Sequence, residues 1–313
     1  MNDRARRDAD TGLAAAPGET QGAAPEIGAW PRFWWSLRRE LWESRSLYLA
    51  PLAVAALIVV GSLLGAIQLP DRMRTAAALA RAPRHEAIVQ HYLVASLLLM
   101  ATTFVVAVFY CLDAFQSERR DRSILFWKSL PVSDLTTVLA KATVPLAILP
   151  LLTVALTFVV QLAMLALSSA ALAGSGHAAL LWSEVDLPRM TVMILYHMVT
   201  VHALWYAPIY AWLLLVSAWA NRVPWLWATL PLLAIGTVER IAFGSRSFAN
   251  LIAYRFAGPQ EGTDVTTPGS MIDPLMRMMP GRFLASPGLW IGLAVAAAFL
   301  YAAVRLRRSR GPV

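Results

Sequence analysis

Long stretches without Asp, Glu, Lys or Arg dominate the hydrophobic pattern of this chain. Six such stretches occur, at residues 46–70, 87–112, 142–183, 190–221, 223–238 and 283–304. A helix needs about 20 apolar residues to cross the hydrocarbon core of a bilayer. Five of the six stretches reach this length, and only 223–238 is shorter. The pattern therefore predicts an all-α polytopic membrane protein.

Six transmembrane helices fit these stretches. We place them near residues 47–69, 91–112, 142–166, 190–217, 223–241 and 287–305. Gly174 and Gly176 break the third stretch, so the residues beyond its helix form an apolar outer loop. The last outer segment, 242–286, contains apolar runs at 248–256 and 271–279. Short helices of this kind can enter the bilayer partway if they pack against protein.

The segment 30–46 precedes the first span and predicts an amphipathic helix. Trp34, Leu37, Leu41 and Trp42 recur at helical spacing, opposite a polar face. Tryptophan side chains favour the headgroup region, so the pattern is typical of a helix that lies in the membrane interface. A cytoplasmic extension of the first span is the alternative interpretation.

Composition supports a membrane protein and excludes several other classes. Of the 313 residues, 58% are hydrophobic and 15% are charged, whereas a soluble chain has about 25% charged residues. These values exclude a disordered chain and a cytosolic enzyme. The single cysteine, Cys111, cannot form an internal disulfide, which excludes a disulfide scaffold, and we expect it to be buried and inert.

The distribution of Lys and Arg predicts the orientation. With both ends in the cytoplasm, 17 basic residues lie inside and 10 outside, as the positive-inside rule requires. The net charge of +8 therefore reports topology, and we expect no nucleic-acid partner. Residues 1–29 are expected to be a disordered cytoplasmic tail. The loop at 70–90 is an exception, because it carries four arginines on the predicted outer side.

The sequence offers little catalytic chemistry. It contains no Walker-type phosphate loop and no G-x-S-x-G nucleophile motif. His197 and His202 are five residues apart, do not share a helix face and have no acidic neighbour, so we expect packed, hydrogen-bonded side chains. Glu239 and Arg240 lie at the outer end of the fifth span and are predicted to form a structural pair or a gate. We expect no catalytic residue, no metal site and no cofactor on this chain.

The loop at 113–141 is the most informative segment. A densely charged run leads into the apolar patch 124–127, and Pro131 then ends the predicted helix. Ser133 or Asp134 can cap the helix that follows. An apolar patch on a polar loop indicates a binding partner, or else contact with the membrane surface.

The run from Glu118 to Ser133, closed by Lys141, resembles the first cytoplasmic loop of type-2 ABC transporter permeases. The resemblance extends through 205–208, 212–221, 224–231 and 239–240, and covers most of residues 30–310. In that family this loop carries a coupling helix that docks into the ATPase subunit. Carried over to this sequence, the resemblance implies ATPase coupling through the 117–134 loop by Glu118, Arg119, Arg120, Asp121, Arg122, Ser123, Ile124, Leu125, Phe126, Trp127, Lys128, Ser129, Pro131 and Ser133.

The resemblance also implies a function. The chain would be the permease subunit of an ATP-driven exporter in a bacterial inner membrane, and its 30–310 region would be the transmembrane domain. Its partners would be two copies of an ATPase, which bind ATP and Mg, and a second permease subunit, identical or related. The cargo stays open between peptide, lipid, drug and polymer. A non-transporting ABC subunit with a signalling or mechanical role is the alternative, and a membrane-embedded hydrolase is a weaker one.

The predicted topology can be tested with single cysteines. Cysteines that replace Leu125 and Val265 should react with a membrane-impermeant maleimide from opposite sides of the membrane, Leu125→Cys only after permeabilisation. The reason is that the first position lies in a predicted inner loop and the second in the last outer segment. Equal labelling of both positions in intact spheroplasts would contradict the six-span arrangement with both ends inside.

Overall fold

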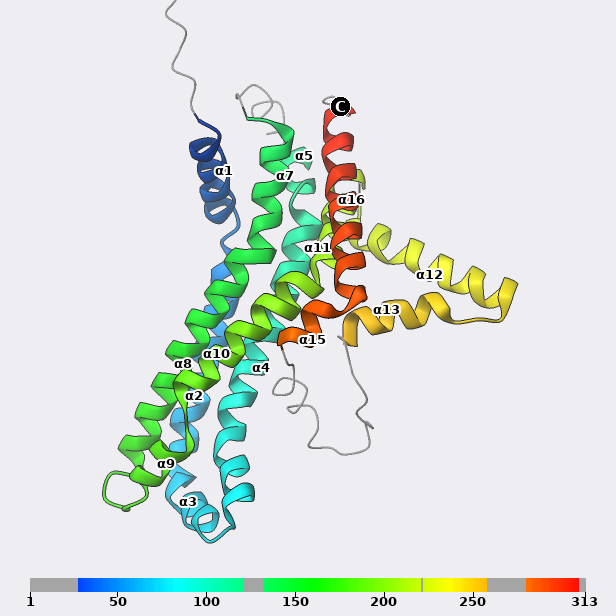
Figure 1. The fold of residues 1–313 in the computed structure, drawn as a ribbon. Helices are drawn as coiled ribbons and strands as arrows, with labels where there is room; N and C mark the ends of the chain where they lie inside the picture. Colours follow the sequence, from blue (N-terminus) through cyan, green and yellow to red (C-terminus); the bar gives the residue numbers. More distant parts are fainter. Residues whose placement is uncertain (1–27, 121–131, 221, 258–279, 310–313) are drawn as a thin grey trace, which may run out of the picture.

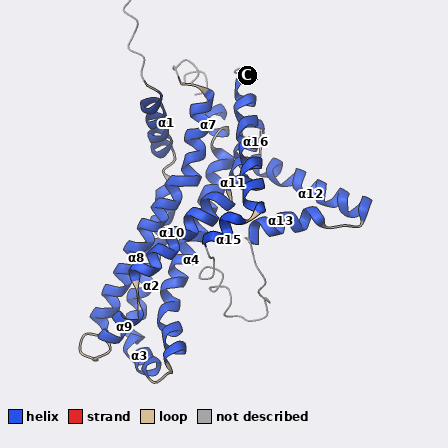
Figure 2. Cartoon of the chain, viewed as in Figure 1, coloured by secondary structure: helices blue, strands red, loops and turns tan. Residues whose placement is uncertain are grey.

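The computed structural model describes residues 28–120, 132–220, 222–257 and 280–309. Within these residues the regular structure is helical and contains no strand (Figure 2). The elements are α1 (Ala29–Glu43), α2 (Ser46–Gly65), η1 (Ala66–Gln68), α3 (Leu69–Ala77), α4 (Arg81–Asp113), α5 (Gln116–Arg120), α7 (Asp134–Thr143), η2 (Val144–Ile148), α8 (Leu149–Ala171), α9 (Ala178–Glu184), α10 (Leu187–His197), η3 (Met198–Trp205), α11 (Ala207–Trp219), α12 (Pro224–Phe243), α13 (Ser247–Ala257), α15 (Pro280–Ala285) and α16 (Pro287–Ser309).

Five continuous helical segments are long and apolar enough to cross a membrane. They are Ser46–Ala77, Arg81–Arg120, Asp134–Ala171, Pro224–Phe243 and Pro287–Ser309. Each contains most or all of one of the predicted spans, which confirms an all-α, multi-pass membrane protein. The predicted helix at 248–256 is α13, whereas the one at 271–279 lies outside the described residues.

The fourth predicted span, 190–217, is not a single straight helix. It consists of α10, η3 and α11, and the chain bends by 47° before α11. η3 is a π-helical segment that ends where the amide of Tyr206 donates to the carbonyl of Val201 at 3.0 Å. Pro208 starts the next helix, because a proline lacks the amide hydrogen that would continue the earlier one. A span predicted from composition alone could not show this bend.

A second π-helical segment, η2, lies beside η3 in the middle of the bundle. It contains Pro145 and joins α7 to α8. π-Helical segments widen a helix locally and interrupt its regular packing. Both interruptions therefore fall at the same level of the bundle, which we call the waist.

Two separate hydrophobic cores lie on either side of the waist. The first core includes Leu47, Cys111, Val138, Leu214 and Ala303. It occupies the end where α1, α7 and the end of α16 lie, here called the α1 end (Figure 1). The second core occupies the opposite end, the α3 end, where α3 and α9 lie; it includes Met73, Val89, Leu99, Leu165 and Leu181. Cys111 is fully buried, as expected.

Buried polar side chains join α4 to α8 within the apolar bundle. Gln161 Nε2 donates to Ser96 Oγ at 2.9 Å, and the hydroxyls of Thr103 and Thr153 are hydrogen-bonded to each other. All four side chains are buried. Hydrogen bonds of this kind hold membrane helices together, because the hydrophobic effect does not act between helices surrounded by lipid.

Two parts of the fold leave the main bundle. α12 and α13 project together from its side (Figure 1), and only 6% of the most apolar part of α12 is buried. The fifth predicted span is therefore the least packed of the five. α1 runs alongside α7 at the α1 end and exposes Trp34 and Trp42 (Figure 1).

Candidate functional site

A network of buried charged residues lies at the α1 end, where the predicted coupling loop joins the bundle. Lys141 of α7 is at its centre, with an exposed fraction of 2%. Its ammonium donates to both carboxylate oxygens of Glu40 at 2.9 Å and lies 3.1 Å from Glu118 Oε1. The hydroxyl of Tyr110 donates to Glu40 Oε2 at 3.0 Å. Helices α1, α4, α5 and α7 are thus joined around one lysine.

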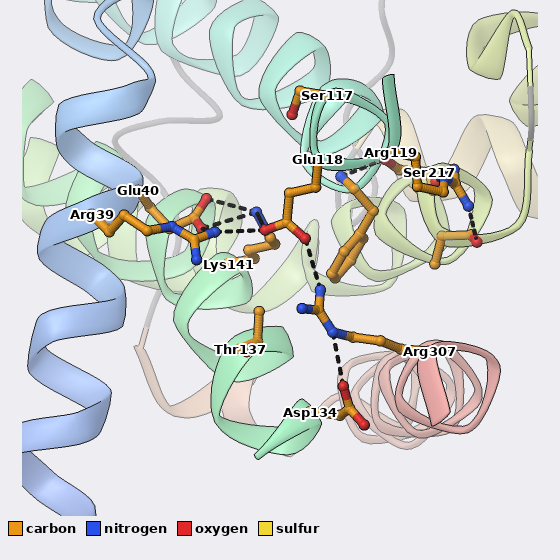
Figure 3. A network of polar contacts seen from close by, with 12 residues as sticks. Arg39, Glu40, Ser117, Glu118, Arg119, Asp134, Thr137, Lys141, Ser217 and Arg307 are labelled. Atoms are coloured by element: carbon orange, nitrogen blue, oxygen red, sulfur yellow. Dashed lines mark hydrogen bonds and ion pairs between the residues drawn. The ribbon is translucent and has the colours of Figure 1, made fainter. Parts of the chain in front are cut away.

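Glu118 is the residue with the most cationic partners in this network (Figure 3). Its carboxylate accepts from Arg39 Nη2 at 2.6 Å and from Arg307 Nη1 at 2.9 Å, in addition to its contact with Lys141. Only 4% of Glu118 is exposed. Because α1, α7 and α16 each supply one cation, a single carboxylate of α5 holds three other helices.

The network extends beyond Glu118 on both sides. Arg307 Nε also donates to Asp134 Oδ1 at 2.9 Å, and Arg39 Nε lies 3.4 Å from Glu43 Oε2. Among the described side chains, three cations (Arg39, Lys141, Arg307) therefore face four carboxylates (Glu40, Glu43, Glu118, Asp134). Removing an ion from water costs several kcal/mol, a cost that close partners must offset. Lys141 Nζ and Arg307 Cζ also lie over the ring of Phe115, 5.3 and 5.7 Å from its centroid. Loss of any one of these charges would therefore leave a partner without full compensation.

Arg119, the next residue of α5, contacts the end of α11. Its guanidinium donates to the carbonyls of Ser217, Ala218 and Ala220, the last at 2.7 Å. The final carbonyls of a helix lack partners within the helix and carry partial negative charge, so a cation is favourable there. The amide of Phe115 also donates to Ser217 Oγ at 3.0 Å. α5 is thereby attached to α11 on one side and to the charged network on the other.

An open groove lies beside the network. It has a volume of about 770 Å³ and is lined by residues of α1, α2, α4, α5 and α7 and by the start of α12, including Glu43, Asp113, Arg120, Lys141 and Trp225. The groove is therefore polar on the network side and aromatic on the α12 side.

The structure separates the predicted coupling residues into two sets. Glu118 and Arg119 make contacts within the chain, and Arg120 is exposed at the groove. Ser133 caps α7, since its hydroxyl accepts from the amide of Thr136 at 3.1 Å. The remaining predicted residues lie outside the described residues: Asp121, Arg122, Ser123, Ile124, Leu125, Phe126, Trp127, Lys128, Ser129 and Pro131.

Glu239 and Arg240 are not paired with each other. Both residues are described, and no ion pair between them occurs; Glu239 instead accepts from Ser245 Oγ at 2.6 Å and from the amides of Ser247 and Phe248 at 2.8 and 2.9 Å. The carboxylate thus satisfies the first amides of α13, as an N-terminal acid does in many helices. Glu239 holds α12 and α13 together, which agrees with a structural role but through a different partner than predicted.

Metal-binding groups and the predicted histidines were the remaining candidates for a site. No group of three His, Cys, Asp or Glu residues that could hold a metal ion is found in this part of the chain. His202 is buried, and its Nε2 lies 3.0 Å from Tyr210 Oη. This hydrogen bond agrees with the packed histidine expected from the sequence.

Sequence reasoning missed most of the network. The sequence does mark Lys141 as unusual, because it is the one charged residue between 135 and 183 and lies next to a long apolar stretch. Arg39 lies on the polar face of the predicted amphipathic helix at 30–46. No feature of the sequence indicates that Glu40 or Arg307 is buried. Their partners come from helices that are distant in sequence, for example 189 residues apart for Arg307 and Glu118, so no local pattern could join them.

Comparison with known protein families, curated proteins and solved structures finds no match to this chain. The fold and the site therefore define its class on their own: a multi-pass α-helical membrane protein with a buried ion network at one end.

Removing the central cation should destabilise the bundle. Lys141→Met leaves Glu40 and Glu118 partly uncompensated, and breaking a buried ion pair in this way costs about 3–5 kcal/mol. The free energy of unfolding can be measured by denaturant titration in detergent micelles. Arg74→Met is the control, since the Arg74–Asp71 pair is exposed and contributes about 1 kcal/mol or less.

A double substitution identifies the cause of that loss. Lys141→Met together with Glu40→Gln removes a positive and a negative charge, so it should recover a substantial part of the stability. If the free energy of unfolding of the single variant Lys141→Met is within about 1 kcal/mol of the wild-type value, the network is not required for the fold.

Proposed function

We propose that this chain is the membrane subunit of an ATP-driven ABC exporter and that the 117–134 loop couples it to a separate ATPase. The observation that carries the proposal is the attachment of Glu118 and Arg119. These residues immediately precede 121–131, and their contacts reach α1, α7, α11 and α16. In the proposed topology, the chain has six spans in a bacterial inner membrane. Both ends of the chain lie in the cytoplasm, and the α1 end of the bundle faces it.

The attachments on both sides of the loop support a mechanical role. Near the start of the loop, Glu118 is held by cations of three helices; at its end, Asp134 binds Arg307 at 2.9 Å. Ion pairs buried in this way resist displacement, because separating them exposes uncompensated charge to a low-dielectric interior. Movement of a docked loop would therefore move the α1 end as a unit rather than the loop alone.

The helices would bend at the waist when the α1 end moves. The two largest hydrophobic cores are separate; η2 contributes Val144 to the first, and residues of η3 belong to two smaller clusters. Interrupted helices are points at which a bundle can change its bend. ATP binding to the partner would favour one bend over another, to the extent that the ATPase binds the two arrangements with different affinity.

The proposal assigns no catalysis to this chain. ATP and Mg would bind two copies of the partner ATPase, and a second permease subunit would complete the translocation path. The exposed apolar side chains of α12, such as Leu233, Val238 and Ile241, are surfaces that lipid or this second subunit would cover. The cargo would be a peptide, a lipid, a drug or a polymer.

The role of the loop can be tested by copurification with a tagged ATPase encoded beside this chain. Trp127→Ala and Phe126→Ala should each reduce recovery of the ATPase at least about tenfold, because buried aromatic anchors typically contribute about 2 kcal/mol or more to an interface. Trp182→Ala is a matched control, since Trp182 is exposed on α9 at the opposite end.

A second variant separates docking from transmission. Glu118→Gln should leave the ATPase bound but lower transport-coupled ATP hydrolysis in vesicles, because Glu118 contacts other helices of its own chain. If the loop variants and Glu118→Gln all behave like the wild type, the loop is not the coupling element. Intact coupling without movement of any cargo would instead favour a non-transporting ABC assembly.

A further inference from the structure

A cavity unrelated to the ion network lies at the α3 end of the bundle. It has a volume of about 710 Å³, is open to the surface of the bundle, and is lined by α2, α3 and α4 and by side chains of α8 and α9. This volume is within the range of about 300–1,000 Å³ that is usual for small-molecule sites. The cavity is therefore large enough to hold a ligand.

The walls of the cavity are largely apolar. Ile58, Met73, Ile88, Leu98 and Met164 are among the lining residues. Along α4 the lining runs from Ala87 to Leu98, which is about 16 Å at the helical rise of 1.5 Å per residue. An elongated apolar cavity of this kind fits an alkyl chain better than a polar solute.

Two glycines of α2 open one wall of the cavity. A Cβ atom added at Gly61 or Gly65 would have no protein atom within 4 Å, and both residues line the cavity. These positions therefore face space that the bundle leaves unfilled. Gly61 is exposed and Gly65 is partly exposed, so this space is open to the surface of the bundle.

One arginine, Arg72, lines the cavity. Gln90 and His91 also line it, and none of its described lining residues is acidic. Arg72 donates to the neutral Gln68 at 3.1 Å, whereas Arg74 pairs with Asp71 and Arg84 with Glu184. The positive charge of Arg72 is thus not neutralised by an acid within this part of the chain, and it lies at one end of an apolar cavity.

We propose that this cavity binds an amphiphile with an acidic headgroup, a carboxylate or a phosphate, taken from the surrounding membrane. The alkyl chain would lie between α2 and α4, and the headgroup would contact Arg72. An apolar body with one charged end matches an apolar cavity with one basic end. This site is independent of the proposed ATPase coupling, and it gives a role to part of the arginine-rich 70–90 loop.

A fluorescent fatty acid tests the site directly. Dansyl-undecanoic acid is titrated into the full-length chain in nanodiscs of phosphatidylcholine, and its methyl ester provides a neutral probe of the same length. The acid should bind saturably and about fivefold more tightly than the ester, the size of one partly exposed ion pair. Phosphatidylglycerol should displace it, and inorganic phosphate alone should not.

Two pairs of variants locate the site. Arg72→Gln should weaken binding of the acid about fivefold and leave the ester unchanged, whereas Arg74→Gln, two residues away and outside the lining, should alter neither. Gly61→Leu and Gly65→Leu should abolish binding of both probes by filling the cavity. Val60→Phe is their control, because Val60 is exposed next to Gly61 and does not line the cavity.

A labelling experiment on the wild type covers variants that fail to fold. A diazirine-bearing fatty acid should crosslink to peptides from α2, α3 and α4, and phosphatidylglycerol should suppress the labelling. Labelling elsewhere, equal binding of acid and ester, displacement by phosphate alone, or wild-type binding by the glycine variants would each overturn the proposal.

Discussion

The α1 end of this protein depends on one constraint: a charge removed from water must have close partners of opposite charge. Glu118 meets this constraint with Arg39, Lys141 and Arg307, which belong to three different helices. Hydrophobic contacts tolerate small shifts of one helix against another, but ion pairs at about 3 Å do not. The network therefore specifies how α1, α5, α7 and α16 are placed, even where its net contribution to stability is small.

The two ends of the bundle are held by different forces. At the α1 end, charged side chains and the contacts of Arg119 with α11 tie the helices together. At the α3 end, an apolar core, hydrogen bonds such as Gln161 to Ser96 and the ion pair of Arg84 with Glu184 do so, and a cavity is left between α2 and α4. The π-helical segments η2 and η3 lie between these ends. The two ends of the bundle therefore differ in how many buried charges they hold.

Local features could be predicted from the sequence because they depend on neighbouring residues. Ser133, one of the two residues predicted to cap this helix, caps α7, and the run at 248–256 is helical. Glu239 shows where this reasoning ends. Its adjacent arginine suggested a pair, but the chain turns at Gly244 and brings the amides of α13 to the carboxylate instead. The sequence could not show that the turn would bring Glu239 of α12 to the first amides of α13, because the two are eight or more residues apart.

The sequence by itself determined that this is an α-helical, multi-pass membrane protein, because stretches of uncharged residues respond to the bilayer and not to one another. It also determined where the polar loop at 113–141 falls. Only the tertiary structure decided which charges face inward: Glu40, Lys141 and Arg307 are separated by 101 residues or more from at least one of their partners in the network. The bend before α11 and the cavity at Gly61 were decided there too, since both arise from how helices pack, and packing depends on contacts between segments that are distant in the chain.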